Sequence, residues 1–174
     1  MTADPGALYE QVTREFGAAL SRLARAYEAG PEQQRDLLQE IHLALWRSLA
    51  IFEGQCSLRT WVYRVAHNTA FSHIARDRRR AGERTWGLDE ALDMPDPHDS
   101  DEATDRERVL EKLYRLIATL HPLDRQIIVL YLEDEDALSI ATITGLSPGN
   151  VATKIHRIKT LLAQRFHARE TRDA

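Results

Sequence analysis

Residues 36–80 read DLLQEIHLALWRSLAIFEGQCSLRTWVYRVAHNTAFSHIARDRRR, and this stretch decides the fold. In its first half, apolar residues recur every three or four positions, which is the period of an amphipathic α-helix with one buried stripe. These residues are Leu37, Leu38, Ile41, Leu45 and Leu49. The opposite side carries Asp36, Gln39, Glu40 and Arg47. Such a face is either simply solvated or available to the cations of a partner protein.

A second helix is predicted to begin after Ser57, whose side chain is a suitable N-cap. One of its faces is apolar and carries Leu58, Trp61, Val62, Val65, Ala66 and Thr69. The other face interleaves rings with polar and basic side chains, namely Thr60, Tyr63, Arg64, His67, Phe71 and Ile74. Rings stack on unpaired bases and arginines neutralise phosphates, so this face suits a nucleic acid. Alternatively, the helix is buried on both sides within a bundle.

An arginine-rich segment follows this helix, with Arg76, Arg78, Arg79, Arg80 and Arg84 within nine residues. Such a run is typical of a contact with a polyanion. The chain as a whole carries a formal net charge of −4, which argues against indiscriminate coating of nucleic acid. A second basic segment covers residues 154–172, so two separate DNA contacts are expected.

The remaining segments indicate an all-α protein made of two small helical domains joined by an acidic linker. Helical periodicity covers residues 8–29, 105–120 and 123–132. Residues 86–104 are acidic, contain two prolines and lack an apolar period, which is typical of a linker. The predicted domains are therefore a helical bundle at 1–85 and a second domain at 105–174.

The second domain contains a pattern typical of a helix-turn-helix at residues 138–159. Gly145 tolerates the left-handed conformation that ends a helix, and Ser147 can cap the next one. In that next helix Val151, Ile155, Ile158 and Leu162 face inward. The residues expected to face DNA are Ser147, Asn150, Thr153, Lys154, Arg157 and Lys159. An ordinary helical hairpin would share this spacing.

Several kinds of protein are disfavoured by the composition. No apolar run approaches the ~20 residues of a membrane span, and no signal-peptide pattern is present. A single cysteine, Cys56, cannot form an internal disulfide, so we expect a cytoplasmic protein. The seven histidines show no compact metal-binding spacing, and there is no phosphate-binding glycine loop, so we expect no cofactor, no metal and no enzymatic activity.

The segments DLLQE (36–40), FEG (52–54), SLRTWVYRVAHN (57–68) and the basic tail together resemble conserved region 2 of bacterial RNA polymerase sigma factors. The similarity is greatest to the two-domain extracytoplasmic-function (ECF) group. The resemblance implies that Asp36, Gln39 and Glu40 contact the β′ coiled coil of core RNA polymerase. It also implies contacts with the −10 promoter element, for which the candidates are Phe52, Gly54, Gln55, Ser57, Arg59, Trp61, Tyr63, Arg64, His67, Asn68, Phe71, Arg76, Arg79 and Arg80.

The helix-turn-helix segment is similar to sigma region 4, which reads the −35 element and docks on the β flap. The two resemblances occur in the order that sigma factors have. They imply a non-enzymatic initiation factor that binds core polymerase and promoter DNA, with an anti-sigma factor as a further expected partner. The alternatives are a stand-alone helix-turn-helix regulator, which would bind duplex DNA tightly by itself, and, last, a helical enzyme.

Overall fold

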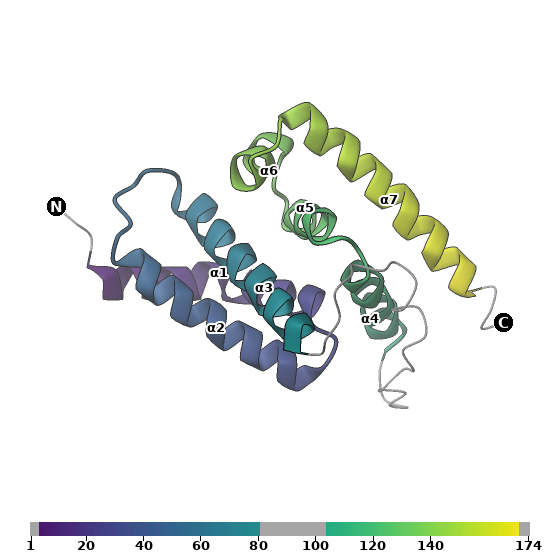
Figure 1. Cartoon of the computed structure of the whole chain (residues 1–174), viewed down its shortest axis with the longest axis horizontal. Coiled ribbons are helices and arrows are strands. Elements are labelled where there is room, and N and C mark those ends of the chain that lie inside the picture. The colour runs from purple at the N-terminus through teal and green to yellow at the C-terminus, as the bar shows by residue number, and fades with distance from the viewer. Residues whose placement is uncertain (1–3, 81–103, 171–174) are drawn as a thin grey trace.

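The computed structural model of the chain describes residues 4–80 and 104–170, and all regular structure in these two ranges is helical. The helices are α1 (Pro5–Tyr27), α2 (Pro31–Leu49), α3 (Leu58–Arg80), α4 (Asp105–Ala118), α5 (Pro122–Leu132), α6 (Ala137–Thr144) and α7 (Pro148–Glu170). The all-α class expected from the sequence is therefore confirmed (Figure 1). Arg84 and all but the last residue of the expected linker at 86–104 lie outside the described residues.

Helix α2 and its neighbours form a three-helix N-terminal unit, α1–α3. The predicted apolar stripe of α2 is confirmed, because Leu37, Ile41, Leu45 and Leu49 are all buried. It packs between α1 and α3, as the strongest helix contacts in the described chain show. The opposing core side chains are Val12, Leu20 and Leu23 from α1 and Val62, Ala66 and Ala70 from α3. Burial of these apolar surfaces supplies the main stabilisation of the unit.

The C-terminal unit, α4–α7, contains the helix-turn-helix. Helix α6 ends at Gly145, whose φ of 77° lies in the left-handed region that glycine adopts without strain. Ser147 then caps α7, because its Oγ accepts a hydrogen bond of 3.3 Å from the backbone N–H of Asn150. Val151, Ile158 and Leu162 of α7 are buried. These features of the predicted turn are confirmed.

Other helix starts also follow from local sequence. Thr104 and Glu107 form a reciprocal capping box at the start of α4. Asp136 accepts a hydrogen bond of 2.7 Å from the backbone N–H of Ser139 and caps α6. Ser57 caps α3, as expected, by accepting from the backbone N–H of Thr60 at 3.0 Å.

The two units pack against each other, with α5 lying between α3 and α7 (Figure 1). The buried side chain of Arg125 on α5 lies at the centre of this contact. Its guanidinium lies 5.2 Å from the centre of the Tyr27 ring and donates to the carbonyl oxygens of Ala118 and of Leu120, the latter at 3.2 Å. Around it, Arg22 forms two hydrogen bonds of 2.6 Å with Glu133. The units are thus joined by a mixed apolar and ionic contact.

None of the helices in the two described ranges has both the length and the apolar character of a segment that crosses a bilayer.

Candidate polymerase and nucleic-acid interface

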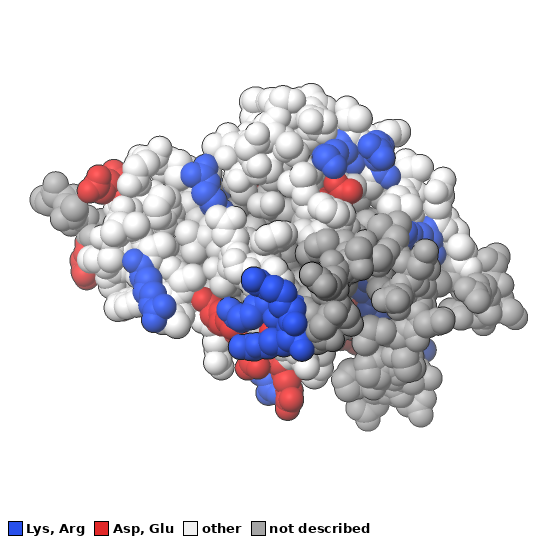
Figure 2. Space-filling view, viewed as in Figure 1, with Lys and Arg blue, Asp and Glu red and all other residues white. Residues whose placement is uncertain are grey.

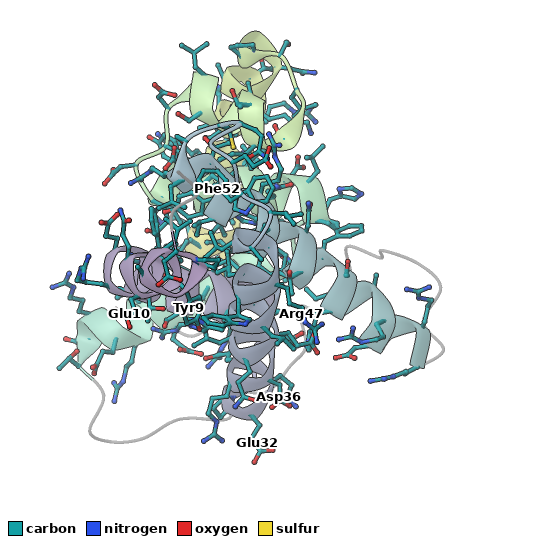
Figure 3. All side chains as sticks on the ribbon, turned by 90° about the vertical axis from the view of Figure 1, so that its left-hand side faces the viewer. Tyr9, Glu10, Glu32, Asp36, Arg47 and Phe52 are labelled. Carbon is teal, nitrogen blue, oxygen red and sulfur yellow. The ribbon has the colours of Figure 1, made fainter. Side chains whose placement is uncertain are left out.

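The outer face of α2 presents the residues expected to contact polymerase. Asp36 and Gln39 are exposed, and Figure 3 shows Asp36 projecting from the first part of α2, far from Phe52 at the opposite end. Glu40 is partly buried, because both of its carboxylate oxygens accept hydrogen bonds from Arg76 of α3, at 2.6 and 2.8 Å. Burial opposes ionisation of Glu40, but hydrogen bonds from Arg76 and His73 outweigh it and hold the pKa of Glu40 below its usual value.

These residues surround a shallow depression with a volume of about 380 Å³ between α2 and α3. Asp36, Gln39, Glu40 and Leu43 line one side, and His73, Arg76, Asp77 and Arg80 line the other. Acidic and basic side chains therefore alternate across it. Figure 2 shows basic and acidic atoms gathered together near the end of α3. A partner surface of mixed charge would suit this depression better than DNA alone.

Exposed apolar side chains continue the outer face of α2, and they were not predicted from the sequence. Leu43 is 49% exposed, Trp46 is 50% exposed and Ile51, just after α2, is 68% exposed. Trp46 packs edge-on against the ring of Tyr9, with 5.2 Å between ring centres. The sequence does contain a pattern that predicts this surface. Leu43 and Trp46 lie away from the buried Leu37 stripe, and apolar residues off the buried face of a helix mark an interaction surface.

The loop between α2 and α3 holds the first of the −10 candidates. Phe52 packs on Trp61 with 5.3 Å between ring centres, and the indole N–H of Trp61 donates to Ser48 Oγ at 3.2 Å. Gln55 closes the loop by accepting from the backbone N–H of Glu53 at 3.0 Å and donating to the carbonyl of Ile51 at 3.2 Å.

Two further loop candidates, Gly54 and Ser57, are exposed. Gly54 has a φ of 80°, a left-handed conformation that favours glycine. The loop is therefore a solvent-facing segment held by internal hydrogen bonds and by the packing of Phe52 on Trp61.

Tyr63 and His67 were expected on an exposed face of α3, and this expectation is wrong. Both side chains are 1% exposed, because α1 covers them. The Tyr27 hydroxyl lies 3.0 Å from Nδ1 of His67, and the ring of Phe16 packs edge-on against Tyr63. Burial lowers the pKa of His67 to about 3 and raises the pKa of Tyr63 to about 12, so both are neutral core residues.

Two other −10 candidates on α3 face the C-terminal unit. Arg59 forms an ion pair with Glu135 and donates to the carbonyl oxygen of Glu133 at 2.8 Å. Arg64 donates to the carbonyl oxygen of Thr142, in α6, at 3.0 Å. Both guanidinium groups are therefore held by the helix-turn-helix unit in this arrangement.

The remaining α3 candidates lie on its outer side. Asn68, Arg79 and Arg80 are exposed, and the ring of Phe71 is 49% exposed. Arg80 lies 3.6 Å from Asp77, while Arg76 is paired with Glu40 as described. This side of α3 combines an accessible ring with basic groups, which is the combination that single-stranded nucleic acid requires.

One side of α7 carries four of the residues expected at the −35 element, namely Asn150, Thr153, Lys154 and Arg157, whereas Lys159 lies on a different side, toward Tyr131 of α5. Ser147, Asn150, Thr153, Arg157 and Lys159 are exposed, while the intervening Val151 and Ile158 are buried. Lys154 is half-buried and its Nζ forms an ion pair of 2.7 Å with Asp124 of α5. Lys159 lies over the ring of Tyr131, 5.2 Å from its centre. The N-terminal turns of α7 thus offer polar and cationic side chains of the kinds that contact base edges and phosphates.

Comparisons with known proteins identify the family of the chain. The family model of Sigma-70 region 2 matches residues 12–80, and that of Sigma-70, region 4 matches residues 110–162. The RNA polymerase sigma factor YlaC of Bacillus subtilis is 30% identical over 159 residues, 87% of this chain and 86% of that protein. The RNA polymerase sigma-H factor of Pseudomonas aeruginosa is 28% identical over 144 residues, 82% of this chain and 72% of that protein.

Solved structures share the fold. The sigma factor RpoE of Bartonella quintana, in complex with the anti-sigma factor NepR, superposes with a TM-score of 0.68 at 18% identity, covering 92% of this chain and 96% of that one. CnrH in complex with the cytosolic domain of CnrY gives a TM-score of 0.62 at 21% identity, covering 92% and 88%. The chain therefore belongs to the ECF group of the sigma-70 family, the RNA polymerase sigma factors that direct promoter-specific initiation of transcription.

Proposed function

We propose that this chain binds core RNA polymerase through the outer face of α2, reads the −35 element with α7 and captures −10 bases with the 50–57 loop and the outer side of α3. The observation that carries this proposal is the separation of the two exposed faces: Asp36 and Gln39 lie on α2, whereas Asn150 and Arg157 lie on α7. Two faces that point to different partners suit a bridging factor rather than an enzyme.

The polymerase surface proposed here joins charged and apolar groups. Asp36, Gln39 and Glu40 supply the polar part, and Leu43 and Trp46 supply a hydrophobic part beside it. An interface with an aromatic anchor surrounded by polar groups is typical of specific protein binding. Because Glu40 is already paired with Arg76, Asp36 and Gln39 are the polar residues readily available to a partner.

On the duplex, α7 acts as the recognition helix. Asn150 and Thr153 approach base edges near the helix N-terminus, and Arg157 and Lys159 contact phosphates or guanine. Lys154 supports this helix through Asp124 and contributes less directly to DNA.

Promoter opening is driven by binding energy. Stacking of an unpaired base on an aromatic side chain contributes roughly 1–3 kcal/mol. This is comparable to the stacking given up, about 1.4 kcal/mol for each base-pair step. Phe71 and the Phe52–Trp61 pair are the rings proposed to accept such bases. The polymerase supplies the remaining binding energy, so a chain with a net charge of −4 can act on DNA without binding it tightly alone.

The contact between the two units has a direct consequence for this function. Arg59 and Arg64 are bound by Glu135 and by the carbonyl of Thr142. Both arginines become available to −10 DNA only when the helix-turn-helix unit moves away from α3. Core polymerase, which takes up both units, is the partner proposed to separate them.

The remaining expectations are proposals of the same kind. We propose that the chain acts in the cytoplasm, where core polymerase is found, and that an anti-sigma factor sequesters it. The support for the latter is that RpoE of Bartonella quintana, which shares this fold, was solved in complex with the anti-sigma factor NepR.

Run-off transcription tests the proposal. Purified core polymerase would be incubated with genomic promoter fragments, with and without the chain. We expect transcripts with defined starts that require the chain. If none form with folded protein and active core, while the chain alone binds duplex DNA tightly and in a salt-dependent manner, the stand-alone regulator replaces this proposal.

A further inference from the structure

Three potential metal ligands meet at the end of the N-terminal unit, at the edge of the depression between α2 and α3, and the proposed function assigns no metal to them. Glu28 caps the C-terminus of α1, and His73 and Asp77 lie one helical turn apart on α3. One ligand atom from each of the three side chains lies within 4.8 Å of the others. The sequence could not reveal this group, because Glu28 and His73 are remote in the chain and no compact ligand spacing links them.

The imidazole of His73 is buried and aimed into this group. Its side chain is 7% exposed, and Nε2 lies 3.5 Å from a Glu28 oxygen and 3.4 Å from an Asp77 oxygen. Nε2 nevertheless makes no hydrogen bond within the described part of the chain. A buried polar atom without a hydrogen-bond partner is unusual and calls for an occupant such as an ion or a water molecule.

The other ring nitrogen has the partner that a metal-bound histidine needs. Nδ1 of His73 lies 3.2 Å from a carboxylate oxygen of Glu40 and 3.2 Å from Nη2 of Arg76. When Nδ1–H donates to Glu40, the lone pair of Nε2 points at two carboxylates, and that contact is repulsive unless a cation lies between them. A carboxylate behind the distal ring nitrogen is the usual outer partner of a metal-binding histidine.

We propose that Glu28, His73 and Asp77 bind one divalent transition-metal ion of the zinc class. With metal–ligand bonds of about 2.0–2.1 Å, neighbouring ligand atoms of a tetrahedral zinc site lie about 3.3 Å apart. The two Nε2–oxygen distances of 3.4 and 3.5 Å match this edge. One imidazole and two carboxylates leave the fourth position open to water or to a donor from a partner.

The charges around this group are consistent with a cation here. Arg76 pairs with Glu40 and Arg80 lies 3.6 Å from Asp77, and within the described residues neither arginine forms an ion pair with Glu28. A bound metal would join the C-terminal end of α1 to α3, at the wall of the depression that His73 and Asp77 share with Asp36, Gln39 and Glu40.

The competing occupant is a proton on Nε2. It gives a neutral imidazole when Nδ1 accepts a hydrogen bond from Arg76, and a histidinium when Nδ1–H donates to Glu40. Titration of the full metal-free chain with ZnCl₂ separates the metal from the proton, by calorimetry and by competition with a chromogenic chelator at pH 7.5. We expect one zinc ion per chain. We also expect Co²⁺ to give the intense visible absorption of a tetrahedral complex.

Variants assign the ligands. Glu28→Gln and Asp77→Asn alter partly exposed side chains, so both variants should fold. Each should weaken zinc binding by more than Glu40→Gln, which changes only the carboxylate behind His73. Glu40→Gln should weaken it about 10–100-fold. The matched control is Glu10→Gln with Glu53→Gln, which removes two exposed carboxylates elsewhere and should leave affinity unchanged. Cys56→Ser tests adventitious binding by the thiol.

The outcomes are distinct. One zinc ion that is lost in Glu28→Gln and Asp77→Asn but kept in both controls supports the site. Binding that survives those two changes, or that disappears with Cys56→Ser, overturns it. Absence of zinc binding by the wild-type chain also overturns it and leaves the proton as the occupant. None of these results depends on transcription, so they do not bear on the proposed function.

Discussion

Arg59 forms an ion pair with Glu135, 76 residues further along the chain, and also donates a hydrogen bond of 2.8 Å to the carbonyl oxygen of Glu133. The glutamate side chain is 5% exposed, whereas that of the arginine is 48% exposed. A residue proposed to contact −10 DNA is thus held by the turn that precedes the helix-turn-helix. This surface of α3 cannot contact −10 DNA and the helix-turn-helix unit at the same time.

Replacing Glu135 with glutamine should therefore favour separation of the two units. Because Arg59 is half exposed, we expect a loss of about 1 kcal/mol, which raises the population of separated molecules about fivefold. Fluorescence energy transfer between labels on α2 and α7 would measure this change. Asp134→Asn is the matched control, since Asp134 is exposed in the same turn and asparagine tolerates its φ of 60°. Equal transfer in wild type and Glu135→Gln would show that the ion pair does not hold the units together.

Charge reversal at Asp36 should weaken core polymerase binding without affecting the fold. Asp36 is exposed, so Asp36→Lys leaves the buried stripe of α2 intact. We expect at least a tenfold loss of affinity, equivalent to about 1.4 kcal/mol, measured by fluorescence anisotropy with labelled chain. Glu10→Lys on α1 makes the same charge change outside the proposed surface. Unchanged affinity of Asp36→Lys would remove this residue from the interface.

The substitution Arg157→Ala should reduce the dependence of transcription on the −35 element. Its side chain is exposed on α7, and loss of one base or phosphate contact costs about 1–3 kcal/mol. Transcription from a promoter with an intact −35 element should fall about tenfold or more, and activity on a −35-deleted template should change little. Arg14→Ala, which removes an exposed arginine from α1, serves as the control. An undiminished effect of the −35 element would contradict the assignment of α7.

His67 should make folding sensitive to mild acid. Its pKa is about 3 in the folded chain because of burial, against about 6.5 when unfolded. Because the pKa of His67 is lower in the folded chain, only the unfolded chain takes up a proton as the pH falls below about 6.5. The free energy of unfolding is therefore highest above this pH and decreases as the pH falls. Between pH 7.5 and 5.5 this amounts to about 1.4 kcal/mol.

Urea denaturation of wild type and His67→Gln at these two pH values measures the effect. Glutamine preserves a polar partner for the Tyr27 hydroxyl but does not titrate. The free energy of unfolding of the variant should fall by about 1.4 kcal/mol less than that of wild type over this range. The same pH dependence in both proteins would rule out His67 as its source.

Local sequence rules were sufficient for most of the helices. The Leu37 stripe, the Ser57 cap and the Gly145 turn each depend on residues within a few positions of one another. Periodicity and capping describe such short-range relations well. The acidic linker and the boundaries 1–85 and 105–174 stay predictions.

Long-range packing explains what the sequence did not reveal. The rings of Tyr63 and His67 follow the spacing of an exposed face, but α1 covers that face as well, so both are buried. The partner of Arg59 lies 76 residues away and the group around His73 spans two helices. A single helical period cannot show which second surface a helix meets.

We expect the chain to open promoter DNA only together with core polymerase. A promoter mapped by run-off transcription, carrying 2-aminopurine within its −10 element, reports unstacking directly by fluorescence. We expect the fluorescence to rise when chain and core are both present, to change little with either alone, and to rise less for Phe71→Ala. Opening by core without the chain, or tight duplex binding by the chain with no opening when core is added, would contradict it.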